Sequence, residues 1–228
     1  MEIQPIAHIH TDFKEKFGIP RQSGLVEALR ASIIFEPPYR VADAVRGLEE
    51  FSHIWLIWEF SQARRESWSP TVRPPRLGGN KRLGVFATRS PFRPNALGLS
   101  VVRLLAVDPD TPQGPVLQVS GADLLDGTPI YDIKPYLPYA DAHPEASGGF
   151  TDQVARRQLE VLCPDELLSR VPEEKRPALL GVLAQDPRPS YQSDPARVYG
   201  MAFGGVEVKF SVNGEILTVQ EILSLSSG

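Results

Sequence analysis

Short apolar runs separated by Gly, Pro and Asp dominate the first two thirds of the chain. Runs rich in Val, Ile, Leu and aromatic residues, bounded in this way, are typical of strands. The pattern predicts strands at residues 3–9, 31–35, 54–60, 83–87, 100–106, 116–120 and 130–133. Helical spacing of apolar residues predicts one short helix over residues 41–51. Short strands without regularly alternating helices favour a mainly β or α+β fold, with an antiparallel barrel or sandwich rather than βαβ units.

The pattern changes after residues 140–149, whose Ala, Pro, Ser and Gly content is typical of a linker. Residues 152–162 have helical periodicity, which predicts a helix there. Two further helices are predicted to begin at Pro164 and Pro172, because each proline is followed by acids in the first helical turn.

The clearest hairpin pattern lies near the end of the chain. The apolar runs 206–212 and 216–219 flank Asn213-Gly214, a dipeptide that favours a type I′ turn. We therefore predict a β-rich domain over residues 1–145 and a small α+β domain over residues 150–228.

The composition fits a globular protein with a sizeable core, since 42% of the 228 residues are apolar and 23% are charged. The single cysteine, Cys163, excludes an intrachain disulfide and a cysteine-based zinc cluster, which suits a reducing cytoplasm. The chain opens without a basic region followed by an apolar run, so no signal peptide is predicted. Apolar stretches such as residues 54–58 are far too short to span a membrane.

Several familiar catalytic motifs are absent from the sequence. It has no P-loop, no GxGxxG, and no GxSxG, HExxH or CxxC motif. His8 and His10 stand two apart on a predicted strand and could begin a metal site, but no third ligand is near, so ordinary strand residues are the preferred interpretation. His53 is interpreted as a packing histidine. No metal is expected.

The net charge of −4 at first argues against a nucleic-acid partner. The placement of the charges changes that picture, because residues 60–95, here called the basic segment, hold eight of the 24 basic residues and one acid, Glu66. An anionic partner is therefore expected to dock there. Solvated surface arginines are the alternative. The eight basic residues are Arg64, Arg65, Arg73, Arg76, Lys81, Arg82, Arg89 and Arg93.

The most informative stretch is a loop within residues 87–100. Pro91 and Pro94 restrict its backbone, so a stiff loop between two strands is predicted. Such a loop is suited to holding a polar, partly aromatic ligand. A proline-stiffened corner with solvated arginines is the alternative. The loop displays Arg89, Ser90, Phe92, Arg93 and Asn95.

Two further segments carry candidate chemistry. Residues 122–141 combine four acids, one lysine and three tyrosines among prolines, although Asp126 with the next glycine also fits an ordinary turn. Asp132 and Lys134 stand two apart on one strand face, where a plain ion pair is the simpler interpretation. Residues 16–24 form an irregular loop that offers Arg21 and Gln22 to a ligand.

Together these segments resemble the TrmO family, also called TsaA or YaeB, of S-adenosylmethionine-dependent tRNA adenosine N6-methyltransferases. The resemblance covers nearly the whole chain. It implies a barrel-like cofactor domain outside the Rossmann class, a small C-terminal domain, a homodimer, and methylation of N6-threonylcarbamoyladenosine beside the anticodon on its 3′ side. The matching stretches are KFGIPRQSGL, LEEFSHIW, GVFATRSPFRPNALGLS, DLLDGTPIYDIKPYLPYAD and DPRPSY.

Carried over position by position, the resemblance implies a set of cofactor contacts. Family members often have a histidine where Ser61 stands, so a backbone contact is the one expected there. The implied contacts are Pro20, Arg21, Gln22, Ser61, Gln62, Arg89, Leu99, Asp123, Leu124, Leu125 and Asp126.

These contacts make physical sense for S-adenosylmethionine. Its carboxylate suits Arg89 or Arg21, and its ribose hydroxyls suit an acid such as Asp126. Its adenine can lie on apolar surface near Leu99 or Leu124. Methyl transfer from a sulfonium is an in-line displacement that needs no metal, so catalysis is expected to rest mainly on positioning.

The acceptor nitrogen of a threonylcarbamoyl adenosine is urea-like and has to lose a proton. We expect an acid or tyrosine to assist, with Asp132 and Tyr136 as candidates, while Asn95 or Lys134 steadies the carbamoyl oxygen. RNA binding is expected through phosphate contacts and through a base stacked on Phe92 or Trp68. The expected RNA contacts are Arg64, Arg65, Arg73, Arg76, Arg82, Phe92 and Arg93.

Two alternatives remain at this point. One is a non-enzymatic RNA-binding or nucleoside-sensing module that uses the same pocket. The other keeps the methyl transfer and changes the acceptor to a small molecule or a protein. Transfer of labelled methyl groups to bulk tRNA separates these alternatives.

Overall fold

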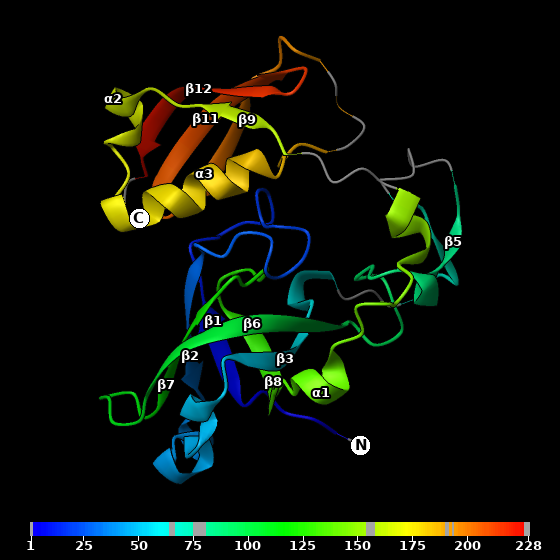
Figure 1. Cartoon of the computed structure of the whole chain (residues 1–228), viewed down its shortest axis with the longest axis vertical. Helices are drawn as coiled ribbons and strands as arrows, with labels where there is room; N and C mark the ends of the chain where they lie inside the picture. Colours follow the sequence, from blue (N-terminus) through cyan, green and yellow to red (C-terminus); the bar gives the residue numbers. More distant parts are fainter. Residues whose placement is uncertain are drawn as a thin grey trace.

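A closed antiparallel barrel forms the first half of the computed structural model, which describes residues 2–63, 67–74, 81–153, 158–189, 192 and 194–225. Every neighbouring pair of strands in the barrel is antiparallel, so the barrel leaves no free edge. The strands, in their order around the barrel, are β1 (Ala7–His10), β2 (Arg30–Phe35), β7 (Val116–Ser120), β6 (Leu97–Asp108), β3 (His53–Glu59) and β8 (Thr128–Pro135) (Figure 1).

Alternation of buried and less buried residues along β1, β2 and most of β3 builds much of the barrel core. In β3, Ile54, Leu56 and Trp58 are buried, whereas Trp55 and Ile57 face outward and are half-buried. Inward residues of the other strands complete one apolar cluster. The predicted barrel class is confirmed, because the period-two pattern of one buried face is what a closed antiparallel sheet requires.

Several predicted elements differ in extent or type. The helix predicted over 41–51 is wrong: two 3-10 helices, Ala42–Val45 and Leu48–Glu50, are separated by Arg46 in an extended conformation and by Gly47 at φ +84°. Among the described residues, the other 3-10 helices are Pro37–Tyr39, Ser61–Ala63, Val85–Ala87, Gly149–Gln153 and Glu173–Lys175. Predicted strand 83–87 shrinks to β5 (Leu83–Gly84), which pairs with β4 (Thr71–Val72).

A separate four-stranded sheet forms the second unit, shown at the top of Figure 1. Its order is β10-β11-β12-β9, with β9 parallel to β12 and the other pairs antiparallel. This confirms the small α+β unit. Its elements are β9 (Glu160–Leu162), α2 (Asp165–Leu168), α3 (Arg176–Ala184), β10 (Tyr199–Phe203), β11 (Val206–Asn213) and β12 (Ile216–Ser224), while α1 (Pro138–Asp141) follows the barrel.

Two predictions about the second unit are corrected. The helix predicted over 152–162 is wrong for residues 160–162, because β9 pairs with β12 and this tertiary pairing overrides the helical period. Residues 154–157 of that prediction lie outside the described residues. The hairpin is confirmed, but its turn residues are Gly214 and Glu215: Asn213 pairs with Ile216, and only Gly214 has positive φ. A glycine alone at the first central position is the geometry of a type II′ turn.

An N-terminal loop between β1 and β2 ties the two units together. Phe13, Val26 and Leu29 from this loop are buried in the apolar core of the second unit. Lys175 also forms an ion pair with Asp12 at 2.6 Å. The loop that carries the predicted ligand residues is therefore fixed by the barrel strands at its ends and by packing against the second unit. No helix in the described ranges combines the length and apolarity that a bilayer crossing demands.

Candidate functional site

A wide cleft lies where the N-terminal loop, the basic segment and the second unit meet. Its volume of about 2980 Å³ exceeds the roughly 300–1,000 Å³ of a typical small-molecule pocket. The cleft can therefore take a cofactor together with part of a larger substrate. Its walls include Arg21 and Gln22 of the N-terminal loop, residues 89–90 and 92–95 of the basic segment, and Arg188 of the second unit.

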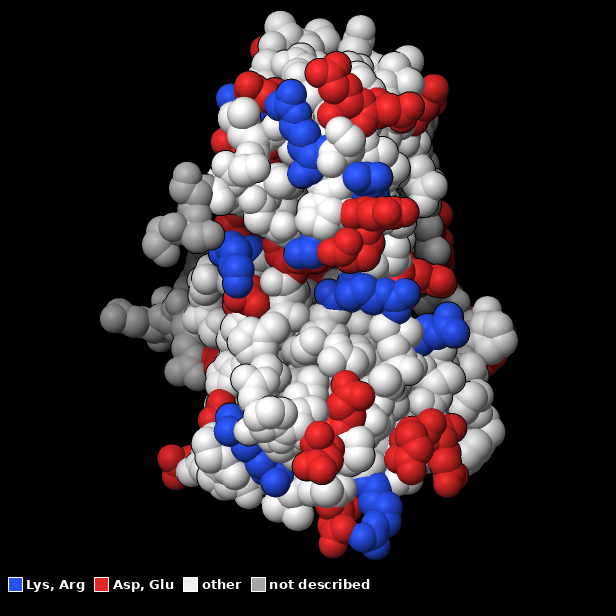
Figure 2. Space-filling view, turned by 90° about the vertical axis from the view of Figure 1, so that its left-hand side faces the viewer, with Lys and Arg blue, Asp and Glu red and all other residues white. Residues whose placement is uncertain are grey.

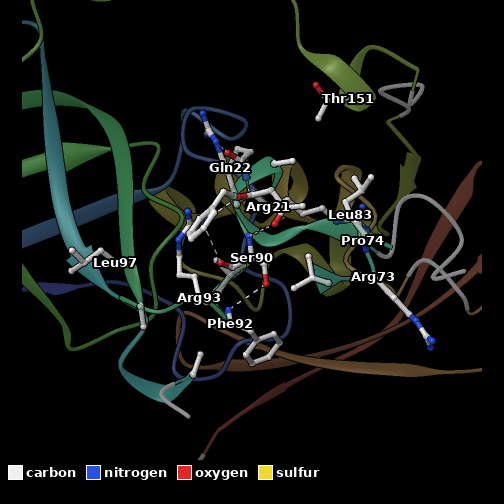
Figure 3. A pocket seen from close by; sticks show the side chains of 18 of the residues that line it. Arg21, Gln22, Arg73, Pro74, Leu83, Ser90, Phe92, Arg93, Leu97 and Thr151 are labelled. Carbon is white, nitrogen blue, oxygen red and sulfur yellow. Dashed lines mark hydrogen bonds between the residues drawn. The ribbon is translucent and has the colours of Figure 1, made fainter. Parts of the chain in front are cut away.

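The loop that carries Arg89, Ser90 and Phe92 is braced from within. Arg93 Nη1 donates to the carbonyl of Thr88 at 3.1 Å and to that of Ser90 at 3.5 Å, and the Phe92 amide donates to Ser90 Oγ at 3.2 Å. Figure 3 shows Ser90 and Arg93 close together within this loop. The predicted stiff loop is thus stabilised by its own side chains as well as by its prolines, and one predicted RNA contact, Arg93, already supports the loop.

Three predicted cofactor residues come together from distant parts of the chain. Arg89 Nη1 donates to Gln22 Oε1, and Arg21 Nη2 donates to the carbonyl of Arg188 at 3.5 Å. Arg21 and Arg89 are exposed residues that line the cleft. Two guanidinium groups beside an amide form a cluster of donors suited to a carboxylate.

A chain of hydrogen bonds runs from the barrel core to Asp123, which lies within the electrostatic influence of Arg89. Trp58 Nε1 donates to Ser100 Oγ at 3.0 Å, and Ser100 Oγ donates to Asp123 Oδ1 at 2.7 Å. Gly98 lets the β6 backbone approach the Trp58 indole, since a Cβ there would lie 2.3 Å from the ring. Desolvation by burial raises the pKa of Asp123, and the hydrogen bond from Ser100 and the charge of Arg89 oppose that rise.

Asp126, another predicted cofactor residue, is engaged by the protein itself. It accepts hydrogen bonds from Lys14 Nζ at 2.5 Å and from the Thr11 amide at 3.0 Å, and His10 lies 3.5 Å away. Burial raises the pKa of Asp126, but these bonds outweigh burial and hold the pKa below its ordinary value. Asp126 therefore ties the N-terminal loop to the turn between β7 and β8.

The structure does not bring every predicted contact to the cleft lining. Pro20 and Leu124 are buried, Leu125 is half-buried, and Leu99 stands on the outer face of β6. The 3-10 helix that holds Ser61 and Gln62 is exposed, and Lys16 Nζ donates to the Gln62 carbonyl at 3.1 Å.

The predicted catalytic residues divide between two places. Asn95 lines the cleft. Asp132 and Lys134 form an ion pair at 3.1 Å, and Tyr136 packs against the rings of His53 and Trp55 beyond the end of β8. Residues 132, 134 and 136 lie outside the lining of the cleft. The catalytic role of these residues stays a prediction.

The predicted RNA contacts also divide. Arg73, Arg82 and Phe92 line the cleft, and Figure 3 shows Arg73 extending outward from it. The predicted contacts Arg64, Arg65 and Arg76 lie outside the described residues.

Sequence reasoning missed a buried acid in the cleft wall. Glu59 is 7% exposed and accepts a hydrogen bond from the Tyr131 hydroxyl at 2.5 Å. A bulge in the β3-β8 pairing, opposite Ile57 and Trp58, leaves Tyr131 as the extra residue and turns it toward Glu59. The sequence did offer a signal, because Glu59 directly follows the apolar run of residues 54–58. A strand rarely buries a charge without a partner, so an acid at this position indicates a hydrogen-bonding partner nearby.

The histidines show other partners than a metal. His8 Nδ1 lies 2.6 Å from Glu36 Oε1, and His53 Nδ1 lies 2.9 Å from Ser52 Oγ. No group of three or more metal-ligating side chains occurs in the part of the chain that the structure describes.

The comparisons with known proteins match this arrangement. A family model described as the tRNA-methyltransferase O N-terminal domain matches residues 8–142, and the TrmO C-terminal domain model matches residues 156–225. The chain belongs to the TrmO family. This confirms the predicted family and, with it, the prediction of a methyltransferase.

Curated TrmO relatives extend over almost the whole chain. The tRNA (adenine(37)-N6)-methyltransferase of Escherichia coli is 42% identical over 219 residues, which are 92% of this chain and 93% of that protein. The enzyme of that name from Eikenella corrodens is 47% identical over 77% of this chain and 98% of its own length. A Pseudomonas aeruginosa relative, 44% identical over 90% of each chain, carries the provisional name S-adenosylmethionine-dependent methyltransferase RcsF, in line with the predicted cofactor.

Solved TrmO structures share the fold. A crystal structure of TrmO from Pseudomonas aeruginosa superposes with a TM-score of 0.77 at 35% identity, over 98% of this chain and 99% of that one. Another TrmO crystal structure gives a TM-score of 0.79 at 36% identity, over 98% of both chains. The barrel with a small α+β unit is therefore the architecture of TrmO.

Proposed function

We propose that this chain is an S-adenosylmethionine-dependent tRNA methyltransferase that methylates N6 of N6-threonylcarbamoyladenosine, beside the anticodon on its 3′ side. The observation that carries the proposal is the meeting of Arg21, Gln22 and Arg89 in a basic cleft of about 2980 Å³. The names of the TrmO relatives, which act on N6 of adenine in tRNA, support the acceptor class.

The residues present fit the cofactor. Arg21, Gln22 and Arg89 would hold its carboxylate through charge-assisted hydrogen bonds. Asp123, which Arg89 influences electrostatically, would suit its cationic groups. When bound, S-adenosylmethionine supplies an electrophilic methyl group on a sulfonium, so the chain has to provide positioning and a dry environment.

The acceptor nitrogen of the proposed nucleoside is urea-like and has to lose its proton as the new bond forms. Asn95 lines the cleft, where its amide can donate to the carbamoyl oxygen. Assistance by Asp132, Lys134 or Tyr136 requires the substrate to reach the outer face of β8. Wild-type single-turnover rates in Asp132→Asn and Tyr136→Phe would remove those residues from the proposal.

The proposed RNA path follows the basic segment. Arg73 and Arg82 would contact phosphates. For each phosphate contact, the affinity for tRNA should therefore fall by about 0.7 log units when the salt concentration rises tenfold. Residues 1–145 would bind the cofactor, and residues 150–228 would supply one wall of the cleft. We also propose a cytoplasmic homodimer, which sedimentation at several protein concentrations tests.

Transfer of labelled methyl groups from S-adenosylmethionine to bulk tRNA tests the proposed function. Wild-type protein should label tRNA, and ribonuclease should release the label. Arg89→Ala should lower the single-turnover rate about 100-fold at limiting cofactor, because a charge-assisted pair to the cofactor is lost. The matched control is Arg103→Ala, an exposed arginine outside the cleft lining, which should leave the rate unchanged.

The outcome that would contradict the proposal is cofactor binding without transfer, which favours the nucleoside-sensing module. Label that resists ribonuclease would instead indicate a small-molecule or protein acceptor. Mass analysis of the labelled nucleoside decides whether the threonylcarbamoyl group is required.

A further inference from the structure

Two aromatic side chains of the basic segment face one another at the cleft and remain exposed. Trp68 is 51% exposed and Phe86 is 73% exposed. Their ring centroids lie 6.1 Å apart, with the ring planes tilted by 31°. Both side chains line the cleft. They form what is here called the aromatic pair.

The short β4-β5 hairpin holds the aromatic pair together. Trp68 precedes β4 and Phe86 follows β5, so the pairing of Thr71 with Gly84 brings the two rings to the same end of the hairpin. The Val85 amide also donates to the Pro70 carbonyl at 2.9 Å, which extends the pairing toward the rings. The positions of the rings are therefore set by backbone hydrogen bonds.

Exposure of these rings is costly unless a partner covers them. Full burial of an aromatic side chain stabilises a fold by about 1.5–3 kcal/mol. The exposed parts of Trp68 and Phe86 do not contribute this stabilisation. The two other tryptophans of the chain behave differently, since Trp58 is 6% exposed in the barrel core and Trp55 is half-buried against Tyr136. Trp68 is the tryptophan that is open to a ligand.

The charge around the aromatic pair identifies the chemistry of that ligand. Within residues 67–74 and 81–95, the described part of the basic segment from the pair onward, there are five basic residues and no acid. Aromatic faces among cations suit single-stranded nucleic acid, whose bases stack on the rings while its phosphates meet the cations. The five basic residues are Arg73, Lys81, Arg82, Arg89 and Arg93.

We propose that the aromatic pair stacks one unpaired base of the tRNA loop, a base other than the adenosine that is methylated. This inference rests on the proposed function and adds a subsite to it. The rings lie on the hairpin, whereas the proposed cofactor residues Arg21, Gln22 and Arg89 form a separate cluster of the same cleft. Stacking at the hairpin would hold the loop while the acceptor base enters the cofactor cluster.

Leucine substitutions test the aromatic pair, because leucine stays apolar and removes only the flat ring. Trp68→Leu and Phe86→Leu should each weaken binding of an anticodon stem-loop RNA about tenfold. Neither should alter the affinity for S-adenosylmethionine. The slope of log affinity against log salt should also stay unchanged, because stacking releases no counterions. Arg73→Gln or Arg82→Gln should lower that slope by about 0.7 per phosphate contact.

The matched control is Tyr139→Leu, which removes an aromatic ring that is 88% exposed and lies outside the cleft lining. Its RNA affinity should equal that of the wild type. Stem-loops with one abasic loop position each should then locate the stacked base. At that position the Trp68→Leu substitution should cost no further affinity, because the partner of the ring is already gone.

Iodide quenching supplies an independent readout. Trp68 should account for most of the accessible tryptophan fluorescence, because Trp58 is buried and Trp55 is half-buried, and the stem-loop should protect Trp68 in the wild type. Unchanged RNA affinity in both leucine variants would overturn the inference. So would a shift from dimer to monomer in those variants, since the aromatic pair would then cover a second copy of the chain. If wild-type protein labels tRNA while the leucine variants bind normally, this inference fails and the proposed function stands.

Discussion

The barrel and the basic segment follow opposite rules of construction. In the barrel, the strands bury their inward side chains, and Ile54, Leu56 and Leu117 have no exposed surface. In the basic segment, the only strands among the described residues are β4 and β5, with two residues each, and the rings of Phe86 and Trp68 remain exposed. Packing thus accounts for the inward residues of the barrel, whereas it does not account for the exposed rings of the basic segment.

Charge separates the two regions as well. The face shown in Figure 2 carries Lys and Arg beside Asp and Glu. Outside the basic segment, charges also pair, as Lys14 does with Asp126 at 2.5 Å. The basic segment holds eight basic residues and a single acid, Glu66, so its charge is almost entirely of one sign. Mixed charge is typical of a solvated surface, and charge of one sign is typical of a site for a polyanion.

The largest expected effect tests whether the barrel acts only as a scaffold. Leu56→Ala should lower the free energy of unfolding by about 2–5 kcal/mol, because it leaves a cavity in a closed core. Below the melting temperature, the folded variant should keep the cofactor affinity of the wild type. Denaturant titration and calorimetric binding measure the two quantities. If the free energy of cofactor binding fell as much as the free energy of unfolding, the barrel core would contribute to the site and would not be a scaffold alone.

Much of the barrel could be predicted from the sequence, because alternation reports burial directly. Strand 116–120 has the predicted bounds, and the runs that became β2 and β3 were located within one residue. Pairings between distant residues could not be predicted in the same way. Residues 160–162 have a helical pattern of apolar residues, but they form a strand because β9 pairs in parallel with β12. That pairing joins residues far apart in the sequence, so the local pattern does not predict it.

The site was predictable where the backbone itself is special. The two prolines of the 87–100 loop indicated a stiff display of side chains, and the structure places Arg89 there beside Gln22, which lies 67 residues away. Residue type alone could not show which acids are already engaged. Asp126 is held by Lys14 and Thr11, whereas Asp123 is held by Ser100, and nothing in the DLLD sequence separates these two environments.

A smaller effect is expected where the barrel meets the cleft. Tyr131→Phe should lower the free energy of unfolding by about 1–3 kcal/mol, because buried Glu59 loses a hydrogen-bond donor. The matched control, Tyr139→Phe, removes a hydroxyl from an exposed ring and should have no measurable effect. Equal melting curves for the two variants would show that the Glu59 carboxylate finds another donor. The Tyr131 hydroxyl at the bulge would then not be needed for the stability of the barrel.

The smallest expected effect concerns the pH dependence of stability at Asp123. Because desolvation by burial raises its pKa above 3.8, the folded state keeps this proton at a pH where the unfolded state has lost it. The ionised Asp123 carboxylate therefore destabilises the folded state, and this destabilisation is complete above the folded pKa. As the pH falls through the folded pKa, the carboxylate is protonated and the destabilisation disappears. Asp123→Asn should remove the cost and raise the free energy of unfolding at pH 7 by roughly 0.5 kcal/mol.

The stabilisation by Asp123→Asn should shrink as the pH falls toward 3.8, which urea titrations at several pH values measure. Asp126→Asn provides the contrast, because the pKa of Asp126 is lowered and its ionised form stabilises the fold. That variant should lose stability at pH 7, and the loss should disappear as acid protonates the wild-type carboxylate. Changes of the same sign in both variants would show that the two acids of the turn share one environment, and the separation of a scaffold acid from a site acid would then fail.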